Sequence, residues 1–369
     1  MNLSASNATA LIRARGLTKT FGERTAVDAI NFDVRDGEFF GFLGPNGAGK
    51  TTTMRMIAGV SPRTAGALSI LGSDPDTAGP RIRGQIGVVH QQETLDQELT
   101  VRENLLVFGR FFGLAHKEIA ERADQLLELF QLSDRAKDQV EPLSGGMKRR
   151  LSIARSLINA PRILMLDEPT TGLDPQARHL LWDALQRLKR AGTTIVLTTH
   201  YMDEAEQLCD RLVVMDQAKI VAEGSPRQLI EQHASREVLE LRFPDGTSGI
   251  SKAALEGIGD RYERLAERVI VGCENGEEAH ARALAHGLTP ESWLVRRSSL
   301  EDVFLRLTGR SLDEGARRRS RRDDRAGSFQ RSAPTSHIQR DGDTLLATWW
   351  PCIDASGSAQ SSLDSWNRS

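Results

Sequence analysis

The sequence has few cysteines and no long apolar run. Each of these absences excludes a class of protein. Its 369 residues include only three cysteines, Cys209, Cys273 and Cys352, which lie far apart and form no CxxC pair. This spacing is typical of reduced thiols rather than of a disulfide framework. No stretch approaches the roughly 18 consecutive apolar residues that a membrane-spanning helix needs. If the protein works at a membrane, another chain must therefore cross it.

Strong net charge and a leader segment are also missing. The net charge is −2, so the chain as a whole does not attract polyanions, and we expect no nucleic-acid partner. Residues 1–10 are polar and lack the apolar core of a secretory signal. The hydrophobic content of 39% is ordinary for a globular protein. The length leaves room for one large domain with an appendage, or for two domains.

A glycine-rich loop lies between an apolar run, residues 39–43, and a helix-forming segment, residues 51–58. Its glycines allow several amide N–H groups to point into one concavity, at the positive end of the following helix. Lys50 can reach the outer phosphates of a nucleoside triphosphate, and the Thr51 hydroxyl can ligate Mg²⁺. A chance glycine-rich turn is the alternative, but the strand before and the helix after it favour a phosphate loop. The predicted loop and its first helical residues are Gly44, Pro45, Asn46, Gly47, Ala48, Gly49, Lys50, Thr51 and Thr52.

The rest of the chain alternates strand and helix patterns, which predicts an α/β fold with a mainly parallel core sheet. An antiparallel β subdomain and a helical subdomain are expected beside that core. Strands are predicted at residues 11–15, 30–34, 67–71, 85–90, 163–166 and 194–198, with a hairpin at 211–215 and 219–222. Helices are predicted at residues 101–112, 117–130, 143–158, 176–190 and 202–209. Glycine- and proline-containing turns are expected between residues 71 and 85.

Changes in composition predict three segments. Residues 11–235 form the α/β domain, and residues 236–314 form a small α+β appendage that ends in a helix over 300–307. Residues 315–369 lack periodicity and are predicted to be a disordered tail. The basic run at 317–325 is interpreted as a solvated segment, with contact to anionic lipid or nucleic acid as the alternative. A read-through extension is a further interpretation of the tail, and Trp349-Trp350 is weak support for an interfacial anchor.

Two carboxylates, Asp167 and Glu168, follow the apolar residues 163–166 directly. The end of a central parallel strand lies at the sheet edge where the phosphate loop also opens. Asp167 can hold Mg²⁺ directly or through water, and Glu168 can polarise a water that attacks the γ-phosphate. A solvated acidic pair in a loop is the alternative, but it does not explain the four apolar residues that precede the pair.

A second anion-binding motif, Ser144, Gly145 and Gly146, occurs at the start of another helix. One triphosphate cannot occupy both sites in a monomer if they lie on different subdomains, whereas two copies placed head to tail could share each nucleotide. At this point the chain resembles the ATP-binding cassette (ABC) ATPases over residues 11–235. In that family the Ser-Gly-Gly helix of one subunit closes on ATP held by the phosphate loop of the other.

The resemblance assigns roles to four further residues. Phe21 matches the aromatic that stacks on adenine, with core packing as the alternative. Gln91 matches the glutamine that contacts Mg²⁺ and water and senses the permease, although Gln92 leaves the register open by one. Asp174 matches the loop that runs between subunits, and His200 matches the histidine that contacts the γ-phosphate. The implied cofactors are ATP and Mg²⁺, and the implied reaction is ATP hydrolysis with Glu168, His200, Gln91 and Lys50 as its catalytic residues.

Within that family, the segments at residues 46–53, 199–205 and 300–309 are similar to the ATPases of bacterial ABC-2 type exporters. That branch includes exporters of daunorubicin-like drugs and of nodulation-factor lipo-oligosaccharides. It implies a dimer of two copies on an ABC-2 type integral membrane permease, at the cytoplasmic face of the bacterial inner membrane. An importer ATPase or a non-transport ABC ATPase is the alternative. Importers are not expected to share the pattern at 300–309, and ribosome-acting relatives carry two cassettes in one chain. In chromosome- and repair-type relatives, a long coiled coil separates the two positions that correspond to Lys50 and Ser144.

Overall fold

The computed structural model describes residues 10–308. The predicted disordered tail, its basic run and Trp349-Trp350 lie outside these residues. The division of the chain at residues 235 and 314 remains a prediction. Within the described part of the chain, no helix has both the length and the hydropathy that a bilayer span requires.

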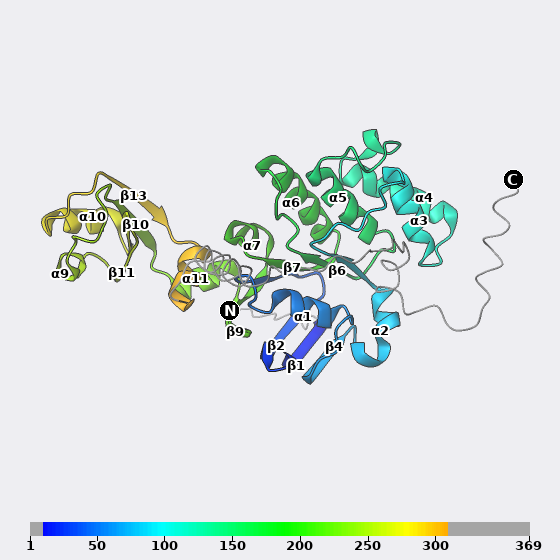
Figure 1. Ribbon diagram of the computed structural model, residues 1–369, viewed down its shortest axis with the longest axis horizontal. Coiled ribbons are helices and arrows are strands. Elements are labelled where there is room, and N and C mark those ends of the chain that lie inside the picture. The colour runs from blue at the N-terminus through cyan, green and yellow to red at the C-terminus, as the bar shows by residue number, and fades with distance from the viewer. Residues whose placement is uncertain (1–9, 309–369) are drawn as a thin grey trace, which may run out of the picture. The chain divides into compact units, whose positions relative to one another are not determined.

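A six-stranded sheet organises the N-terminal part of the chain (Figure 1). Five of its strands run parallel and the last pairs antiparallel at one edge. Strands buried on both faces need an apolar residue at nearly every position, which is why their sequences form continuous apolar runs. In spatial order the strands are β5 (Ile86–Val89), β6 (Ile163–Asp167), β7 (Thr194–Thr199), β3 (Phe39–Leu43), β8 (Arg211–Asp216) and β9 (Lys219–Gly224).

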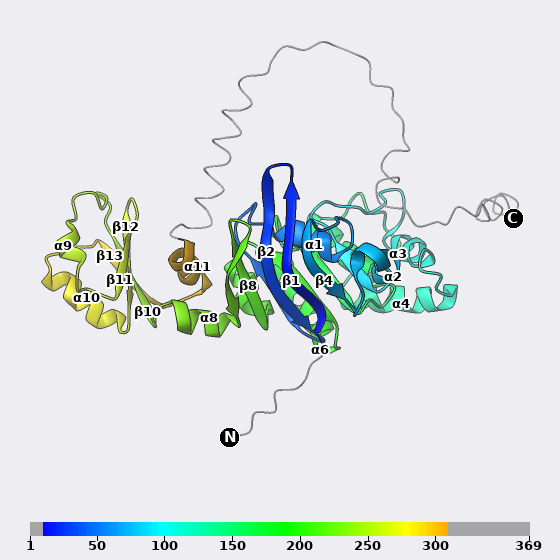
Figure 2. The same ribbon diagram turned by 90° about the horizontal axis from the view of Figure 1, so that it is seen from below.

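Alternate residues of β3 contribute to two different cores. Phe39 and Leu43 face a core formed with helices, whereas Phe40 and Phe42 face a core formed with an antiparallel sheet and α1. Figure 1 shows these layers on opposite sides of β6 and β7. The helices with residues in the first core are α3 (Val101–Arg110), α4 (His116–Leu129), α5 (Gly145–Ser156), α6 (Pro175–Arg190), α7 (Met202–Leu208), α8 (Pro226–His233) and α11 (Leu300–Thr308). The second core contains α1 (Lys50–Ile57) and the sheet β2 (Arg24–Arg35), β1 (Ala10–Phe21) and β4 (Ala65–Ile70), whose long β1–β2 hairpin is visible in Figure 2.

The fold class is therefore the predicted one, but the expected turns between residues 71 and 85 are wrong. This segment contains a helix, α2 (Pro75–Arg83). Asp74 caps its first turn by accepting from the Asp76 N–H, and Pro75 occupies the first helical position, where a missing N–H costs nothing. Pro80 lies inside the helix next to a kink at Ala78, and this proline conceals the helical pattern.

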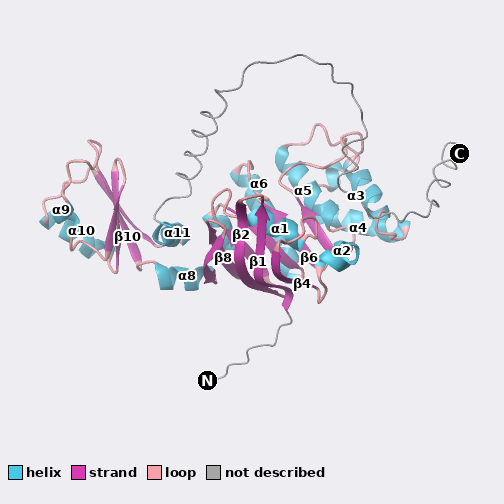
Figure 3. Ribbon diagram, turned by 60° about the horizontal axis from the view of Figure 1, so that its bottom comes forward, coloured by secondary structure: helices cyan, strands magenta, loops and turns pink. Residues whose placement is uncertain are grey.

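The C-terminal segment forms a third sheet with the order β11-β12-β10-β13 and helices on one face (Figure 3). The β-α-β-β-α-β order with antiparallel pairing is that of a ferredoxin-like fold. Its elements are β10 (Glu237–Arg242), α9 (Lys252–Leu255), β11 (Arg261–Arg264), β12 (Arg268–Cys273), α10 (Gly276–Ala285) and β13 (Ser292–Arg297). The chain then ends its described part in α11 (Leu300–Thr308), which packs on α7 and α8.

Candidate active site

The phosphate loop connects β3 to α1, as its sequence predicts. Gly49 is the N-cap of α1 and has a φ of 110°, which side chains rarely allow. A Cβ at this position would lie 2.5 Å from the Ala26 carbonyl oxygen, so only glycine lets the loop approach β2. The buried Lys50 ammonium curls back over the loop and donates to the carbonyls of Gly44, at 2.7 Å, and Pro45, at 3.2 Å. Burial lowers the pKa of Lys50, against the opposing effect of Glu168.

Asp167 and Thr51 come from distant parts of the sequence and meet at this loop. The Thr51 hydroxyl donates to Asp167 Oδ1 at 3.2 Å, and the Thr198 hydroxyl donates to the same oxygen at 2.5 Å. Asp167 ends β6, and β6 lies next to β7, which carries Thr198. A hydroxyl and a carboxylate are hard oxygen ligands, and Mg²⁺ prefers such ligands.

Glu168 lies between two cationic or polar partners. Its Oε1 is 3.5 Å from Lys50 Nζ and 3.4 Å from His200 Nδ1, and its side chain is almost fully buried. Burial by itself would raise the pKa of Glu168, but His200 and Lys50 outweigh it, so the pKa of this carboxyl lies below its usual value. The carboxyl is therefore ionised near neutral pH, as the orientation of a water requires.

Four other predicted site residues lie apart from the phosphate loop on this chain. Ser144 caps α5 by accepting from the Met147 N–H at 3.3 Å, and Asp174 caps α6 by accepting from the Ala177 N–H at 2.9 Å. Phe21 is 55% exposed at the end of β1, and Gln91 is exposed after β5. Within residues 10–308, no hydrogen bond or ion pair connects these four residues to Lys50, Thr51 or Glu168.

Gly145 and Gly146 form the first turn of α5 beside Ser144. A Cβ on Gly146 would lie 2.8 Å from the Ala177 Cβ, so the missing side chain lets α5 and α6 approach each other closely. Gly145 has no such neighbour within 4 Å.

Three residues that contact the site were not predicted from the sequence. The Thr171 hydroxyl donates to Glu168 Oε2 at 3.4 Å. Thr198 holds Asp167, as described above, and its hydroxyl also accepts from the Glu168 N–H at 3.1 Å. Arg149 of α5 donates from Nε to the Pro169 carbonyl at 2.9 Å and from Nη2 to the Asp167 carbonyl at 2.8 Å. Its Nη1 donates to the His90 carbonyl. Because these partners are mostly backbone atoms, residue type gives no signal for them.

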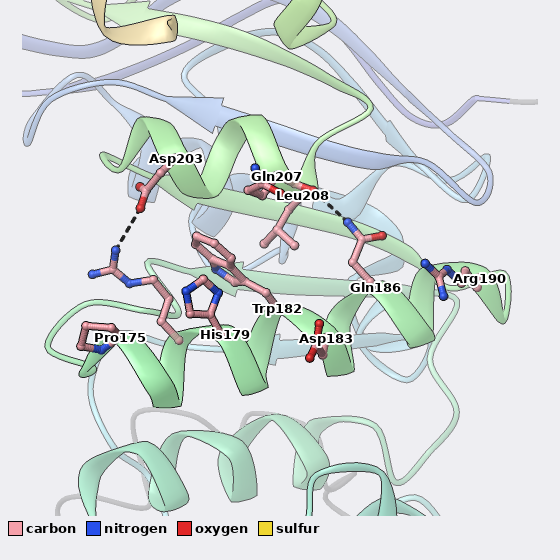
Figure 4. Close-up of a pocket in the computed structure, with 10 residues that line it drawn as sticks. Pro175, His179, Trp182, Asp183, Gln186, Arg190, Asp203, Gln207 and Leu208 are labelled. Carbon is pink, nitrogen blue, oxygen red and sulfur yellow. Dashed lines mark hydrogen bonds and ion pairs between the residues drawn. The ribbon is translucent and has the colours of Figure 1, made fainter. Parts of the chain in front are cut away.

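A groove of about 690 Å³ lies between α6 and α7, next to the loops that carry Asp174 and His200 (Figure 4). Figure 4 shows Trp182 reaching from α6 toward α7, with Asp203 in an ion pair at the rim. None of the predicted catalytic residues lines this groove.

A phosphate loop at the carboxyl edge of a parallel sheet, with Asp167 and Glu168 at the end of β6, separated from β3 by β7, defines a P-loop nucleotide-hydrolysing domain. The family model described as "ABC transporter" matches residues 27–171. The chain belongs to the ABC transporter family, as one of its ATP-binding and ATP-hydrolysing subunits. The predicted family, fold class, ATP binding and ATPase activity are thereby confirmed.

Two curated relatives share most of the chain. The Nod factor export ATP-binding protein I of Cupriavidus metallidurans is 45% identical over 82% of this chain and 99% of its own. The protein of the same name from Rhizobium sp. (strain N33) is 46% identical over 81% of this chain and 97% of its own.

Two solved structures share the fold. An ATP-binding subunit of an ABC transporter is 31% identical, with a TM-score of 0.55, and the match covers 60% of this chain and 92% of that one. A dimeric post-hydrolysis state of an ATP-binding cassette, bound to ADP and Pi, is 29% identical with a TM-score of 0.53. That match covers 58% of this chain and 98% of the other.

Proposed function

We propose that this ATPase energises an ABC-2 type membrane exporter of a nodulation-factor-like lipo-oligosaccharide. The names of the curated relatives support export, and they favour a lipo-oligosaccharide over a drug-like compound. The permease that crosses the membrane is a separate chain in this proposal. The ATPase then acts at the cytoplasmic face of the bacterial inner membrane.

The observation that carries the catalytic part of the proposal is the contact of Glu168 with both Lys50 and His200. In the proposed reaction, the loop amides and Lys50 bind the outer phosphates of ATP. Glu168 orients the attacking water, and His200 contacts the γ-phosphate. Thr51 and Asp167 hold Mg²⁺, which would neutralise phosphate charge, and their oxygen atoms already lie 3.2 Å apart. Gln91 would add the remaining contact to Mg²⁺ and to the attacking water.

Ser144, Gly145, Gly146 and Asp174 act on the nucleotide of a second copy in this proposal. Within residues 10–308, none of them has a hydrogen bond or ion pair to the phosphate loop of its own chain. Ser144 and Asp174 cap the N-termini of α5 and α6, and helix N-termini favour anions. Phe21 is exposed at the end of β1 and supplies an aromatic face for adenine. Two copies of the chain therefore enclose two ATP molecules.

Replacing Glu168 with glutamine tests the catalytic assignment. The change keeps the side-chain shape but removes the base, so ATP should still bind while turnover falls roughly 10²–10⁴-fold. ATP binding and steady-state ATPase activity of the purified full-length chain measure the two effects separately. In cells that make the exported compound, the same variant should leave the compound inside the cell. Near-normal turnover would remove Glu168 from the catalytic role, and unchanged export by an inactive ATPase would contradict the transport role.

A further inference from the structure

The backbone of Glu168 is strained. Its φ is 46°, in the left-handed region that non-glycine residues rarely adopt. A residue keeps such a conformation only where its surroundings hold it, and strained residues concentrate at functional sites. On one side, the Glu168 N–H is held by the carbonyl and the hydroxyl of Thr198, both at 3.1 Å.

The side chain of Arg149 holds the same segment from the other side. Its Nη2 donates to the carbonyl of Asp167, the residue before Glu168, and its Nε donates to the carbonyl of Pro169, the residue after it. Because a guanidinium group is planar and rigid, these two bonds fix the spacing of the two carbonyls. The carbonyl groups of the residues before and after Glu168 are therefore attached to α5.

The third bond of Arg149 extends this connection. Its Nη1 donates to the carbonyl of His90, the residue directly before Gln91. One partly buried cation thus joins α5, which begins after Ser144 with Gly145 and Gly146, to the Gln91 loop and to the Glu168 segment. The carboxylates of Asp167, Glu204 and Glu168 act on its charge from the β6 end and from α7, against the effect of burial.

We propose that Arg149 is a positioning residue for ATP hydrolysis. It fixes the Glu168 carboxyl in its reactive orientation and ties that orientation to the loop that carries Gln91. The inference rests on the proposed catalytic role of Glu168. Arg149 itself contacts only backbone carbonyls, so it contributes to turnover through Glu168 and not through nucleotide binding.

The neighbouring Arg150 provides a matched control. It also lies on α5 and also donates to a backbone carbonyl, that of Phe130 at 2.6 Å. Phe130 lies at the end of α4, away from the phosphate loop. Arg150→Met therefore removes a guanidinium and a carbonyl bond from the same helix without touching the Glu168 segment.

The test compares Arg149→Met, Arg149→Lys and Arg150→Met in the full-length chain. We expect Arg149→Met to lower kcat by about tenfold or more, with KM for ATP and the affinity for ATP changed by less than about threefold. Arg149→Lys should lie between Arg149→Met and wild type, because an ammonium cannot bond three carbonyls in one plane. Arg150→Met should stay within about twofold of wild-type kcat. Thermal unfolding of all three variants shows whether a loss of activity is a loss of folded protein.

A double mutant shows whether Arg149 acts through Glu168. If it does, Arg149→Met combined with Glu168→Gln should be no slower than Glu168→Gln alone. The inference is overturned if Arg149→Met and Arg150→Met lose equal activity, if the loss lies in KM, or if the two losses multiply. Should Arg149→Met fail to fold, the same comparison with Arg149→Lys decides. Near-normal turnover of Glu168→Gln alone would instead overturn the proposed role of Glu168, whatever Arg149 does.

Discussion

At the scale of single residues, the backbone of the phosphate loop limits which residues can replace Gly49. Two separate constraints act on this position. Its φ of 110° disfavours any side chain, and the Ala26 carbonyl occupies the place of a Cβ. Lys50 follows directly, so a shift at Gly49 would move the ammonium that is proposed to bind the phosphates.

We predict that Gly49→Ala abolishes ATP binding, because the added methyl must displace either the loop or β2. Gly72→Ala is the matched control. Gly72 also has a positive φ, of 78°, but a Cβ there would meet no atom within 4 Å. The control should therefore lose about 1–2 kcal/mol of stability while it still binds ATP. Titration with a fluorescent ATP analogue and thermal unfolding of both variants check this; equal ATP affinity in the two variants would contradict the steric argument.

Some residues at the site could be predicted from their residue type and their neighbours in the sequence, and others could not. Lys50, Thr51, Asp167 and Glu168 stand in short motifs whose neighbours predict a loop or a strand end, and the structure brings these four together. Arg149 could not be predicted, since its partners are carbonyl groups, which every residue has. Which carbonyls lie within its reach depends on how α5 packs against β5 and the end of β6.

At the scale of elements, the buried strands and most helices of the N-terminal part could be predicted, whereas α2 and β11 could not. β6 and β7 are buried at every position, and apart from Asp167 at the end of β6 their residues are all apolar or β-branched. α2 was missed because of Pro80, and the four-residue strand β11 is too short for its alternation to be significant. The ferredoxin-like order of the C-terminal sheet depends on pairing between distant strands, which local pattern does not specify.

The start of α11 is held by a buried carboxylate. Asp302 accepts two bonds from Arg296 of β13, at 2.7 and 2.9 Å, and one from the Ser299 N–H at 2.8 Å. The Leu300 N–H donates to Glu206 of α7 at 2.6 Å. Burial alone would raise the pKa of Asp302, but Arg296 and the Ser299 N–H outweigh it, so this pKa lies below its usual value.

We predict that Asp302→Asn lowers the free energy of unfolding by about 1–2 kcal/mol at neutral pH, since Arg296 is partly exposed and solvent weakens the pair. A carboxyl with a lowered pKa stabilises the fold fully above the unfolded-state pKa of about 4, and this stabilisation is lost as the pH falls through the folded-state pKa. The difference between wild type and Asp302→Asn should thus be constant from pH 8 to about 5 and shrink below about 4. Chemical unfolding across this range measures it. Asp245→Asn, on the exposed surface of the same segment, should show no difference at any pH.

At the scale of the whole molecule, the two motifs that we propose to bind phosphate do not meet within one copy of the chain. The phosphate loop lies at α1, which packs on β2, β6 and β7. Ser144 lies at the start of α5, which packs on α3, α4, α6 and β5. A closed two-fold dimer satisfies both motifs at once, because each copy then supplies the loop of one site and the Ser-Gly-Gly motif of the other.

Purified heterodimers with a different tag on each chain test this arrangement, with Lys50→Ala to inactivate a phosphate loop and Ser144→Arg to block a Ser-Gly-Gly motif. A heterodimer with one substitution on each chain keeps one intact site if the sites are shared, so about half of the wild-type ATPase activity should remain. A heterodimer of wild type with a chain that carries both substitutions has one defect in every shared site and should be inactive. If each chain completed its own site, the two results would be exchanged, because only the second heterodimer would contain an unaltered chain. ATPase activity per heterodimer therefore decides between a shared and a separate site without any assumption about the permease.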